Sequence, residues 1–231
     1  MLYFGLDITY WLIMIPFFLF ALWAQSRVKA AYKKYSRIAI YNGLTGAQTA
    51  QQILLNNRIT DVRVERGSGL LSDHYNPSKK VIRLSPGVYD SNSVAAVSIA
   101  AHETGHAIQH AKAYSPLALR SVLAPTASIG SNFAFIIIFA GLLINMAGLI
   151  KFGIALFAIV VFFQLVTLPV EFDASARAKR ALVSYSMVNN TELKGVNTVL
   201  NAAAMTYVAA AASAIAQLLY LLLRSGFLGD D

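Results

Sequence analysis

One short segment of the sequence combines metal-binding residues with a residue that can act as a general base. It reads His-Glu-Thr-Gly-His at positions 102–106, within a stretch, 94–113, whose spacing predicts a helix. Two histidines four residues apart lie on one face of a helix, where both imidazoles can reach one zinc ion. Glu103, beside the first histidine, can take a proton from water, as it does in metalloproteases with this motif. The segment therefore predicts a single catalytic zinc ion bound by His102 and His106.

The residues before this motif indicate that its histidines are buried. Few positions of such a motif are fixed, so chance matches occur, and a helix with surface histidines is the alternative. Residues 94–101 read Val-Ala-Ala-Val-Ser-Ile-Ala-Ala, a mostly apolar run typical of a buried helix. Buried polar side chains need partners, and a metal ion is one. The context therefore favours metal binding.

A catalytic zinc ion needs a third protein ligand and one open position. His110 continues the series on the same helix face. Three residues along one rigid helix cannot easily share a tetrahedral ion, and residues 107–109 lack the glycine at which metzincins bend before their third histidine. We therefore interpret His110 as a partner of a ligand or as an ordinary histidine on the helix face.

Glu171 is the better candidate for the third ligand. It lies in Pro-Val-Glu-Phe-Asp-Ala-Ser-Ala-Arg at 169–177, after a pair of apolar stretches. Such a hairpin returns the chain to the side of the membrane where His102 lies. Asp173 is the alternative third ligand. It lies two residues after Glu171, so on a helix its side chain would point in another direction. It fits better as a hydrogen-bond acceptor for a metal ligand or as a partner of Arg177.

The composition is that of a membrane protein. Hydrophobic residues make up 57% of the 231 residues and charged residues 13%, against about 45–50% and about 25% in soluble domains. No cysteine is present, which excludes disulfides and thiolate metal ligands. Four stretches approach or exceed the roughly 20 residues that a helix needs to cross a bilayer, namely 6–23, 122–149, 152–170 and the alanine-rich 199–223. A cleaved signal peptide is the alternative for the first stretch, but no basic segment precedes it and no cleavage site is obvious after it.

The basic residues predict the orientation in the membrane. Five of them follow the first apolar stretch directly and three follow the third, whereas only Lys151 lies between the second and the third. The positive-inside rule then places both long loops in the cytoplasm and both termini outside the cell membrane. Basic cytoplasmic loops of a protein in the lipid bilayer account for the net charge of +8, so we expect no nucleic-acid partner.

The polar region around 25–120 is expected to contain a small β-sheet. Residues 27–56 have helical spacing that Gly43 and Gly46 can interrupt. Turn signals separate three predicted strands, at 62–66, 70–76 and 81–85. Ser91 or Ser93 is expected to cap the helix that carries the metal-binding motif.

Together these elements predict a mainly α membrane protein, with about four transmembrane helices, a cytoplasmic zincin-like helical region and a small β-sheet. We expect five successive parts. They are a transmembrane helix in 1–26, the metallopeptidase region in 27–120, a transmembrane hairpin in 121–170, a cytoplasmic segment with the third ligand in 171–198, and a last transmembrane helix with its tail in 199–231.

Two distant segments together resemble a known family. His-Glu-Thr-Gly-His-Ala-Ile-Gln-His at 102–110 is followed, after the hairpin, by Leu-Pro-Val-Glu-Phe-Asp-Ala-Ser-Ala-Arg-Ala at 168–178. This pairing is similar to the YugP-type neutral zinc metallopeptidases of bacteria, as are Ser-Asp-His-Tyr-Asn-Pro at 72–77 and Val-Ile-Arg-Leu-Ser at 81–85. The resemblance covers nearly the whole chain. It implies a multi-pass membrane metallopeptidase with one zinc ion on the two motif histidines and Glu171, and it implies no particular substrate.

A more distant resemblance is to the HtpX-type membrane peptidases, whose zinc helix is followed by Glu-x-x-Ala-Asp. Glu171 and Ala174 match that pattern, but Ser175 stands where the aspartate would be. Such an aspartate supports a zinc-bound histidine by a hydrogen bond. Ser175 can offer only an uncharged hydrogen bond, and Asp173 is the other candidate for the supporting role.

Three further residues are candidates for stabilising the oxyanion. His74 lies on a predicted strand before the zinc helix and could donate to the oxyanion of a substrate bound as an added strand. A surface histidine on a strand is the simpler interpretation. Arg177 and Tyr185 are weaker candidates, because spacing alone cannot place such donors.

The predicted reaction is hydrolysis of peptide bonds in membrane-associated or unfolded protein substrates. A non-catalytic zinc-binding membrane protein, such as a sensor, is the alternative, and Glu103 counts against it because that residue need not bind metal. A transporter with intramembrane histidines is a further alternative, but the apolar stretches carry almost no ionisable residues. The sequence does not predict an oligomeric state.

Overall fold

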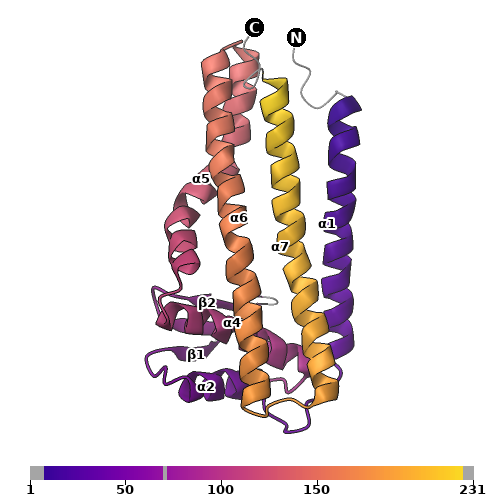
Figure 1. Cartoon of the computed structure of the whole chain (residues 1–231), viewed down its shortest axis with the longest axis vertical. Coiled ribbons are helices and arrows are strands. Elements are labelled where there is room, and N and C mark those ends of the chain that lie inside the picture. The colour runs from indigo at the N-terminus through magenta and orange to yellow at the C-terminus, as the bar shows by residue number, and fades with distance from the viewer. Residues whose placement is uncertain (1–7, 70–71, 226–231) are drawn as a thin grey trace. The chain divides into compact units, whose positions relative to one another are not determined.

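The computed structural model describes residues 8–69 and 72–225, which divide into two compact units. One unit contains parts of α1 (Ile8–Tyr35), α6 (Ala147–Ser184) and α7 (Asn190–Arg224), together with nearly all of α5 (Ser115–Leu143). The other, comprising Ala24–Leu117 and Pro169–Met205, contains the remaining elements and the other ends of the three long helices. Figure 1 labels the helices along the chain.

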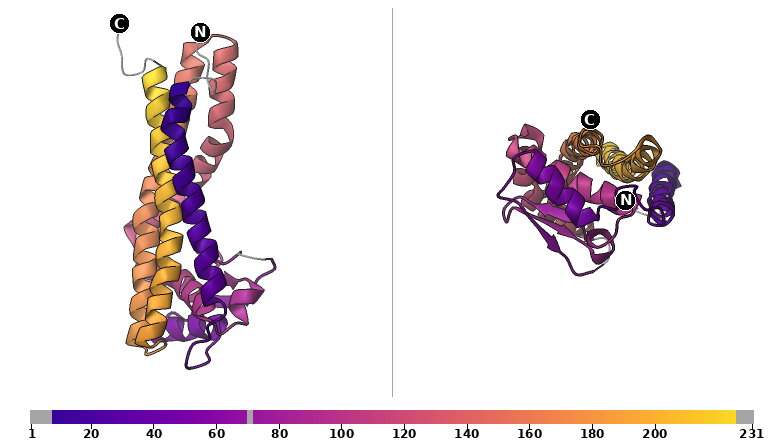
Figure 2. Two further views of the ribbon diagram at one scale, coloured as in Figure 1. Left: turned by 90° about the vertical axis from the view of Figure 1, so that its right-hand side faces the viewer. Right: turned by 90° about the horizontal axis from the view of Figure 1, so that it is seen from below.

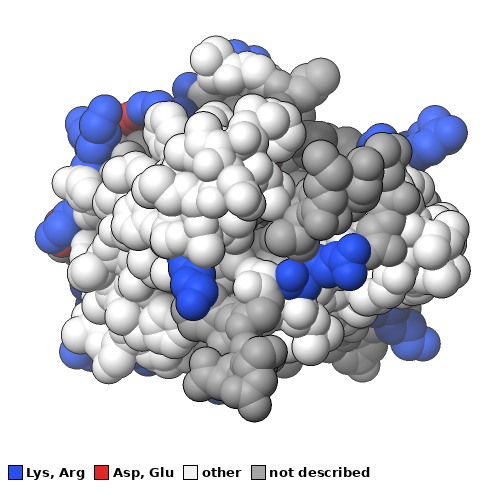
Figure 3. All heavy atoms as spheres, turned by 90° about the horizontal axis from the view of Figure 1, so that it is seen from above, with Lys and Arg blue, Asp and Glu red and all other residues white. Residues whose placement is uncertain are grey.

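The first unit confirms the prediction of four apolar helices. Within the described residues, α1, α5, α6 and α7 are long and apolar enough to cross a membrane. Apolar side chains of α5, α6 and α7 pack together, among them Ile138, Phe157 and Leu221. Most side chains of described residues that are visible in Figure 3 carry no charge.

One predicted span is too long. The apolar stretch 122–149 continues through the end of α5 at Leu143 and into α6, which begins at Ala147. Between them the chain turns at Asn145, whose φ of 54° lies in the left-handed region. The turn residues Ile144 and Met146 are apolar as well, so hydropathy alone does not reveal the boundary.

The second unit contains the predicted three-stranded sheet. Strands β1 (Arg63–Arg66), β3 (Val81–Leu84) and β2 (His74–Asn76) lie in that order, with β1 parallel and β2 antiparallel to β3. All three are shorter than predicted. Leu70 and Leu71 of the predicted strand 70–76 lie outside the described residues. The order places β2 at one edge of the sheet, and Figure 2 shows the sheet beside helices of the same unit.

Helix α4 (Val94–Ala111) runs through the core of this unit, as its small apolar residues predict. Ser93 caps it, accepting a hydrogen bond from the main-chain N–H of Ala96. Helix α1 ends at Tyr35 and α2 (Gly46–Asn56) begins only after residues 36–45, so the predicted helical segment 27–56 is interrupted. The short helix α3 (Pro86–Tyr89) follows the sheet. The core around α4 draws apolar side chains from α2, β3, α6 and α7, among them Ile53, Ile82, Leu182 and Leu200.

Candidate metal centre

Helix α4 presents two imidazole rings side by side. His102 and His106 lie one turn apart, with their ring centroids 4.8 Å apart and their planes at 85°. The side chain of His102 is 14% exposed and that of His106 is 9% exposed. The two rings therefore occupy a largely buried site, as the apolar character of the helix predicts.

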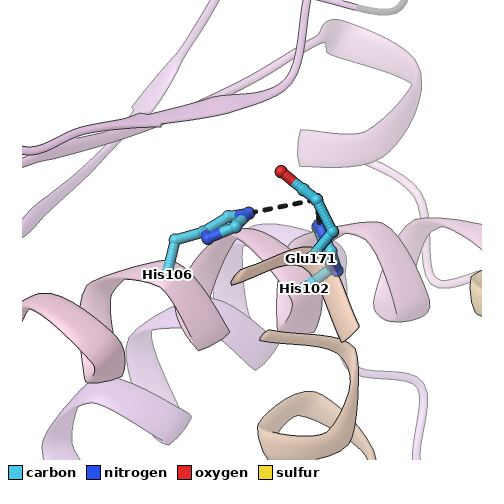
Figure 4. Close-up of side chains that lie close together, drawn as sticks. All are labelled: His102, His106 and Glu171. Carbon is cyan, nitrogen blue, oxygen red and sulfur yellow. Dashed lines mark hydrogen bonds and ion pairs between the residues drawn. The ribbon is translucent and has the colours of Figure 1, made fainter. Parts of the chain in front are cut away.

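Glu171 of α6 completes a three-residue cluster with these rings. Its Oε2 lies 3.1 Å from Nε2 of His102 and 3.6 Å from Nε2 of His106, and its side chain is only 2% exposed. Figure 4 shows the carboxylate directed toward both imidazoles. The three groups offer ligand atoms within 4.8 Å of one another, which makes them a candidate metal-binding group.

A glycine in the motif allows α6 to lie this close to α4. A Cβ atom added at Gly105 would lie 2.4 Å from the main-chain oxygen of Ala174, which belongs to the α6 segment that carries Glu171. No side chain fits in that space, so the two helices make main-chain contact beside the ligands. Sequence reasoning treated Gly105 only as a variable position within the motif.

We expect the Gly105→Ala variant to have a lower melting temperature and a lower zinc affinity than the wild type. Alanine favours a helix by about 1 kcal/mol over glycine, but overpacking at a contact of this kind costs about 1–3 kcal/mol. Thermal unfolding in detergent and zinc titration measure the two effects. Gly148→Ala is the matched control, because a Cβ atom there would meet no heavy atom within 4 Å. A Gly105→Ala protein as stable as this control would contradict the packing interpretation.

Each imidazole has a hydrogen-bond partner on its other nitrogen. In the tautomer that leaves Nε2 free for a metal, Nδ1 of His106 donates to Oε1 of Gln109 at 3.0 Å. Nδ1 of His102 donates in the same way to Oγ of Ser175 at 3.1 Å. Gln109 is fully buried and in turn donates to the main-chain oxygen of Val170 at 2.8 Å. These contacts orient both rings with Nε2 toward Glu171.

Sequence reasoning missed Gln109, although a signal was present. It is a polar residue three positions after His106, on the same face of a helix that should be buried. Its Nε2 also donates to Oδ2 of Asp173 at 2.9 Å. The amide thus links a candidate ligand on α4 to a carboxylate on α6.

Replacing Ser175 by alanine is expected to weaken zinc binding by about tenfold, because loss of a hydrogen bond behind a metal ligand costs about 10–100-fold in affinity and this partner is uncharged. Competition with a chelator measures the affinity. Ser184→Ala, a change of the same kind at an exposed site near the end of α6, is the control. Equal affinities of the two variants would show that Ser175 does not support His102.

The carboxylates around His106 favour its protonated form. Burial lowers the pKa of His106, but the nearby carboxylates of Glu171 and Glu103 raise it by more, so that the pKa lies above the ordinary value. A site that stabilises a positive charge at this position also suits a metal cation.

Glu103 stands beside this cluster and is held by the sheet. It is partly buried, and its Oε2 accepts a hydrogen bond from the main-chain N–H of Tyr75 in β2 at 3.0 Å. It is not one of the residues of the three-residue metal-binding group. A carboxylate that neighbours the metal candidates without joining them is available to accept a proton.

The remaining predicted site residues have other contacts in the structure. Asp173 accepts hydrogen bonds from Gln109 and from Nε of Arg177, and Arg177 also lies over the ring of Tyr114. The ring nitrogen Nδ1 of the exposed His74 lies 2.7 Å from the main-chain oxygen of Ser72. Arg177 and Tyr185 line a cavity of about 450 Å³. The other residues that line it are Asn57, Ile108, Lys112, Arg180, Ala181 and Ser184.

The donor set fits zinc. Two imidazole nitrogens and one carboxylate oxygen are the ligands of one major class of catalytic zinc sites, and hydrogen bonds to the distal nitrogens of the imidazoles are the usual support. Four apolar helices, a small sheet and this buried His-His-Glu group define the protein as a membrane protein with a candidate metallopeptidase centre.

Comparison with known proteins gives the family. The chain belongs to the family described as "Putative neutral zinc metallopeptidase", whose model matches residues 10–226. It is 48% identical over 197 residues to the "Putative membrane protease YugP" of Bacillus subtilis (strain 168), an alignment that covers 85% of this chain and 88% of that protein. No solved structure matches the chain significantly. The resemblance to the YugP-type family is therefore confirmed.

Proposed function

We propose that this protein is a membrane-embedded zinc metalloendopeptidase in which His102, His106 and Glu171 hold one zinc ion. The observation that carries the proposal is the convergence of these three side chains, with donor atoms within 4.8 Å of one another, beside the carboxylate of Glu103 that the N–H of Tyr75 holds. Membership of the zinc metallopeptidase family supports the same choice of metal.

Glu103 acts as the general base and general acid in this proposal. Zinc, when bound, lowers the pKa of water and polarises the carbonyl of the peptide bond. The carboxylate of Glu103 takes the proton of the attacking water and returns it to the amine that leaves. The hydrogen bond from the N–H of Tyr75 holds one carboxylate oxygen, and the other oxygen is free to exchange the proton. Oxyanion stabilisation by His74 or Arg177 stays a prediction.

The sheet beside the site suits an extended substrate. Strand β2 lies at an edge of the sheet and contacts α4 through Tyr75 and Glu103. A peptide chain can add to such an edge as a further strand, which brings its main chain alongside the catalytic carboxylate. We therefore infer that the substrates are unfolded or locally extended segments of proteins, including membrane-associated proteins.

The active site is proposed to lie on the cytoplasmic side of the cell membrane. The basic residues that follow the first and third apolar stretches support this orientation through the positive-inside rule. Because Glu171 directly follows the third apolar stretch, the site would lie close to the inner membrane surface. Substrates that are already in the bilayer or at its surface would reach it most readily.

The Glu103→Gln substitution in the full-length protein tests the proposal. The variant should bind zinc like the wild type and should fail to cleave a labelled unfolded protein. A variant that cleaves as fast as the wild type would refute the proposed mechanism.

A further inference from the structure

Tyr75 contacts two residues of α4 at once, Glu103 and His110. Its main-chain N–H donates to Oε2 of Glu103 at 3.0 Å, and its hydroxyl lies 2.6 Å from Nδ1 of His110. The rings of Tyr75 and His110 are 5.8 Å apart. Glu103 and His110 are seven residues apart, two helical turns, and so lie on one side of α4. One residue of β2 thus connects the candidate base to a histidine that the three-residue metal-binding group does not contain.

The hydroxyl of Tyr75 can donate a hydrogen bond to His110. Burial, helped by the charge of Asp61, raises the pKa of Tyr75 to about 12, so the hydroxyl keeps its proton at neutral pH. Nδ1 of His110 accepts this hydrogen bond in the tautomer that carries its hydrogen on Nε2. The hydrogen bond therefore connects β2 directly to α4.

Strand β2 is held mainly from the side of β3, where Asp73, directly before the strand, accepts hydrogen bonds from the N–H and the hydroxyl of Ser85. It contains three residues and pairs with β3 alone, through His74, Tyr75 and Asn76. A short edge strand held on one side by a few ladder hydrogen bonds can shift or fray. The hydrogen bond to His110 holds the strand from the side of α4, and it acts on the same residue whose N–H donates to Glu103.

We propose that Tyr75 and His110 are positioning residues for the general base: their hydrogen bond fixes β2 against α4 and so holds the N–H of Tyr75 on the carboxylate of Glu103. This inference rests on the proposed function, in which that carboxylate transfers the proton. It gives His110 a role other than that of a third metal ligand. Loss of the hydrogen bond between Tyr75 and His110 should impair the chemical step while metal binding is retained.

The test uses four variants of the full-length protein. Tyr75→Phe keeps the ring and the N–H but removes the hydroxyl, and His110→Leu removes the acceptor. The third variant combines both changes. His110→Asn restores an acceptor, because the side-chain oxygen of asparagine lies close to the position of Nδ1. Tyr41→Phe is the matched control, since it removes a tyrosine hydroxyl in the same unit that donates to the main-chain oxygen of Ser186.

We expect Tyr75→Phe and His110→Leu each to lower kcat by about three- to tenfold, the typical net effect of one hydrogen bond. KM and zinc affinity should stay unchanged. The double variant should be no slower than either single variant, because both changes remove the same interaction. His110→Asn should recover most of the rate, and Tyr41→Phe should behave like the wild type. A purely structural role would lower the melting temperature without this pattern in kcat.

Several results would overturn the inference. Additive losses in the double variant would show that the two residues act independently, and a wild-type kcat in Tyr75→Phe would show that the hydrogen bond is unnecessary. Loss of zinc in the His110 variants would make His110 a ligand. Glu103→Gln, assayed in parallel, separates these failures from a failure of the proposed function, because only the latter leaves Glu103→Gln active.

Discussion

The Glu103→Gln variant is expected to lose peptide hydrolysis and to keep its zinc. Glutamine has nearly the same shape as glutamate, and its side-chain oxygen can still accept the N–H of Tyr75. It cannot take a proton from water, however. General base catalysis contributes about 10²–10⁴ in rate, so we expect at least a hundredfold loss of kcat. Cleavage of a labelled unfolded protein and zinc content, both measured on the same preparation, give the two quantities.

A carboxylate elsewhere in the same unit is the control for this change. Glu65 of β1 lies on the sheet, where its Oε2 is 3.3 Å from a guanidinium nitrogen of Arg83. Glu65→Gln removes the same charge without touching the site, and it should keep both activity and zinc. If Glu103→Gln lost its zinc as well, Glu103 would be a ligand and another group would have to serve as the base.

The Glu171→Gln variant is expected to bind zinc at least about a hundredfold more weakly and to lose activity with the metal. Loss of a residue that merely supports a ligand costs about 10–100-fold, and Glu171 is proposed to be a ligand itself. The side chain is 2% exposed and lies against His102 and His106, so the substitution removes a negative charge directly beside both imidazoles. Zinc content of the purified protein and anomalous scattering at the zinc edge locate the ion and its ligands.

Asp173→Asn distinguishes the two acidic candidates on α6. The contacts of Asp173 are with Gln109 and Arg177, and not with either imidazole of the metal-binding group. Its variant should therefore keep zinc within about tenfold of the wild type. Zinc loss in Asp173→Asn together with zinc retention in Glu171→Gln would make Asp173 the third ligand and would refute the proposed site.

The local features of this protein could be predicted from its sequence. The spacing of His102 and His106 puts both rings on one face, because that face is a property of any α-helix. The four long apolar helices follow from runs of apolar residues, and the preference of serine for helix starts predicts a cap at Ser91 or Ser93, of which the structure uses Ser93. These features depend only on residues that are close together in the chain, so they can be predicted from the sequence. Helix ends such as Leu143, where the turn is as apolar as the helix, are the exception.

Contacts between distant segments were decided by tertiary packing. The sequence favoured Glu171 over Asp173, but the distance of Glu171 from the imidazoles depends on the main-chain contact of α6 with Gly105. The hydrogen bonds of Gln109 with Val170 and Asp173, and the hydrogen bond from the N–H of Tyr75 to Glu103, likewise join segments that no sequence pattern pairs. The face of a helix on which a side chain lies depends only on the local sequence. The residue that this side chain contacts depends on how helices and strands pack. The chain alone therefore determines the residue types of the candidate centre, and only the folded structure decides which of them meet.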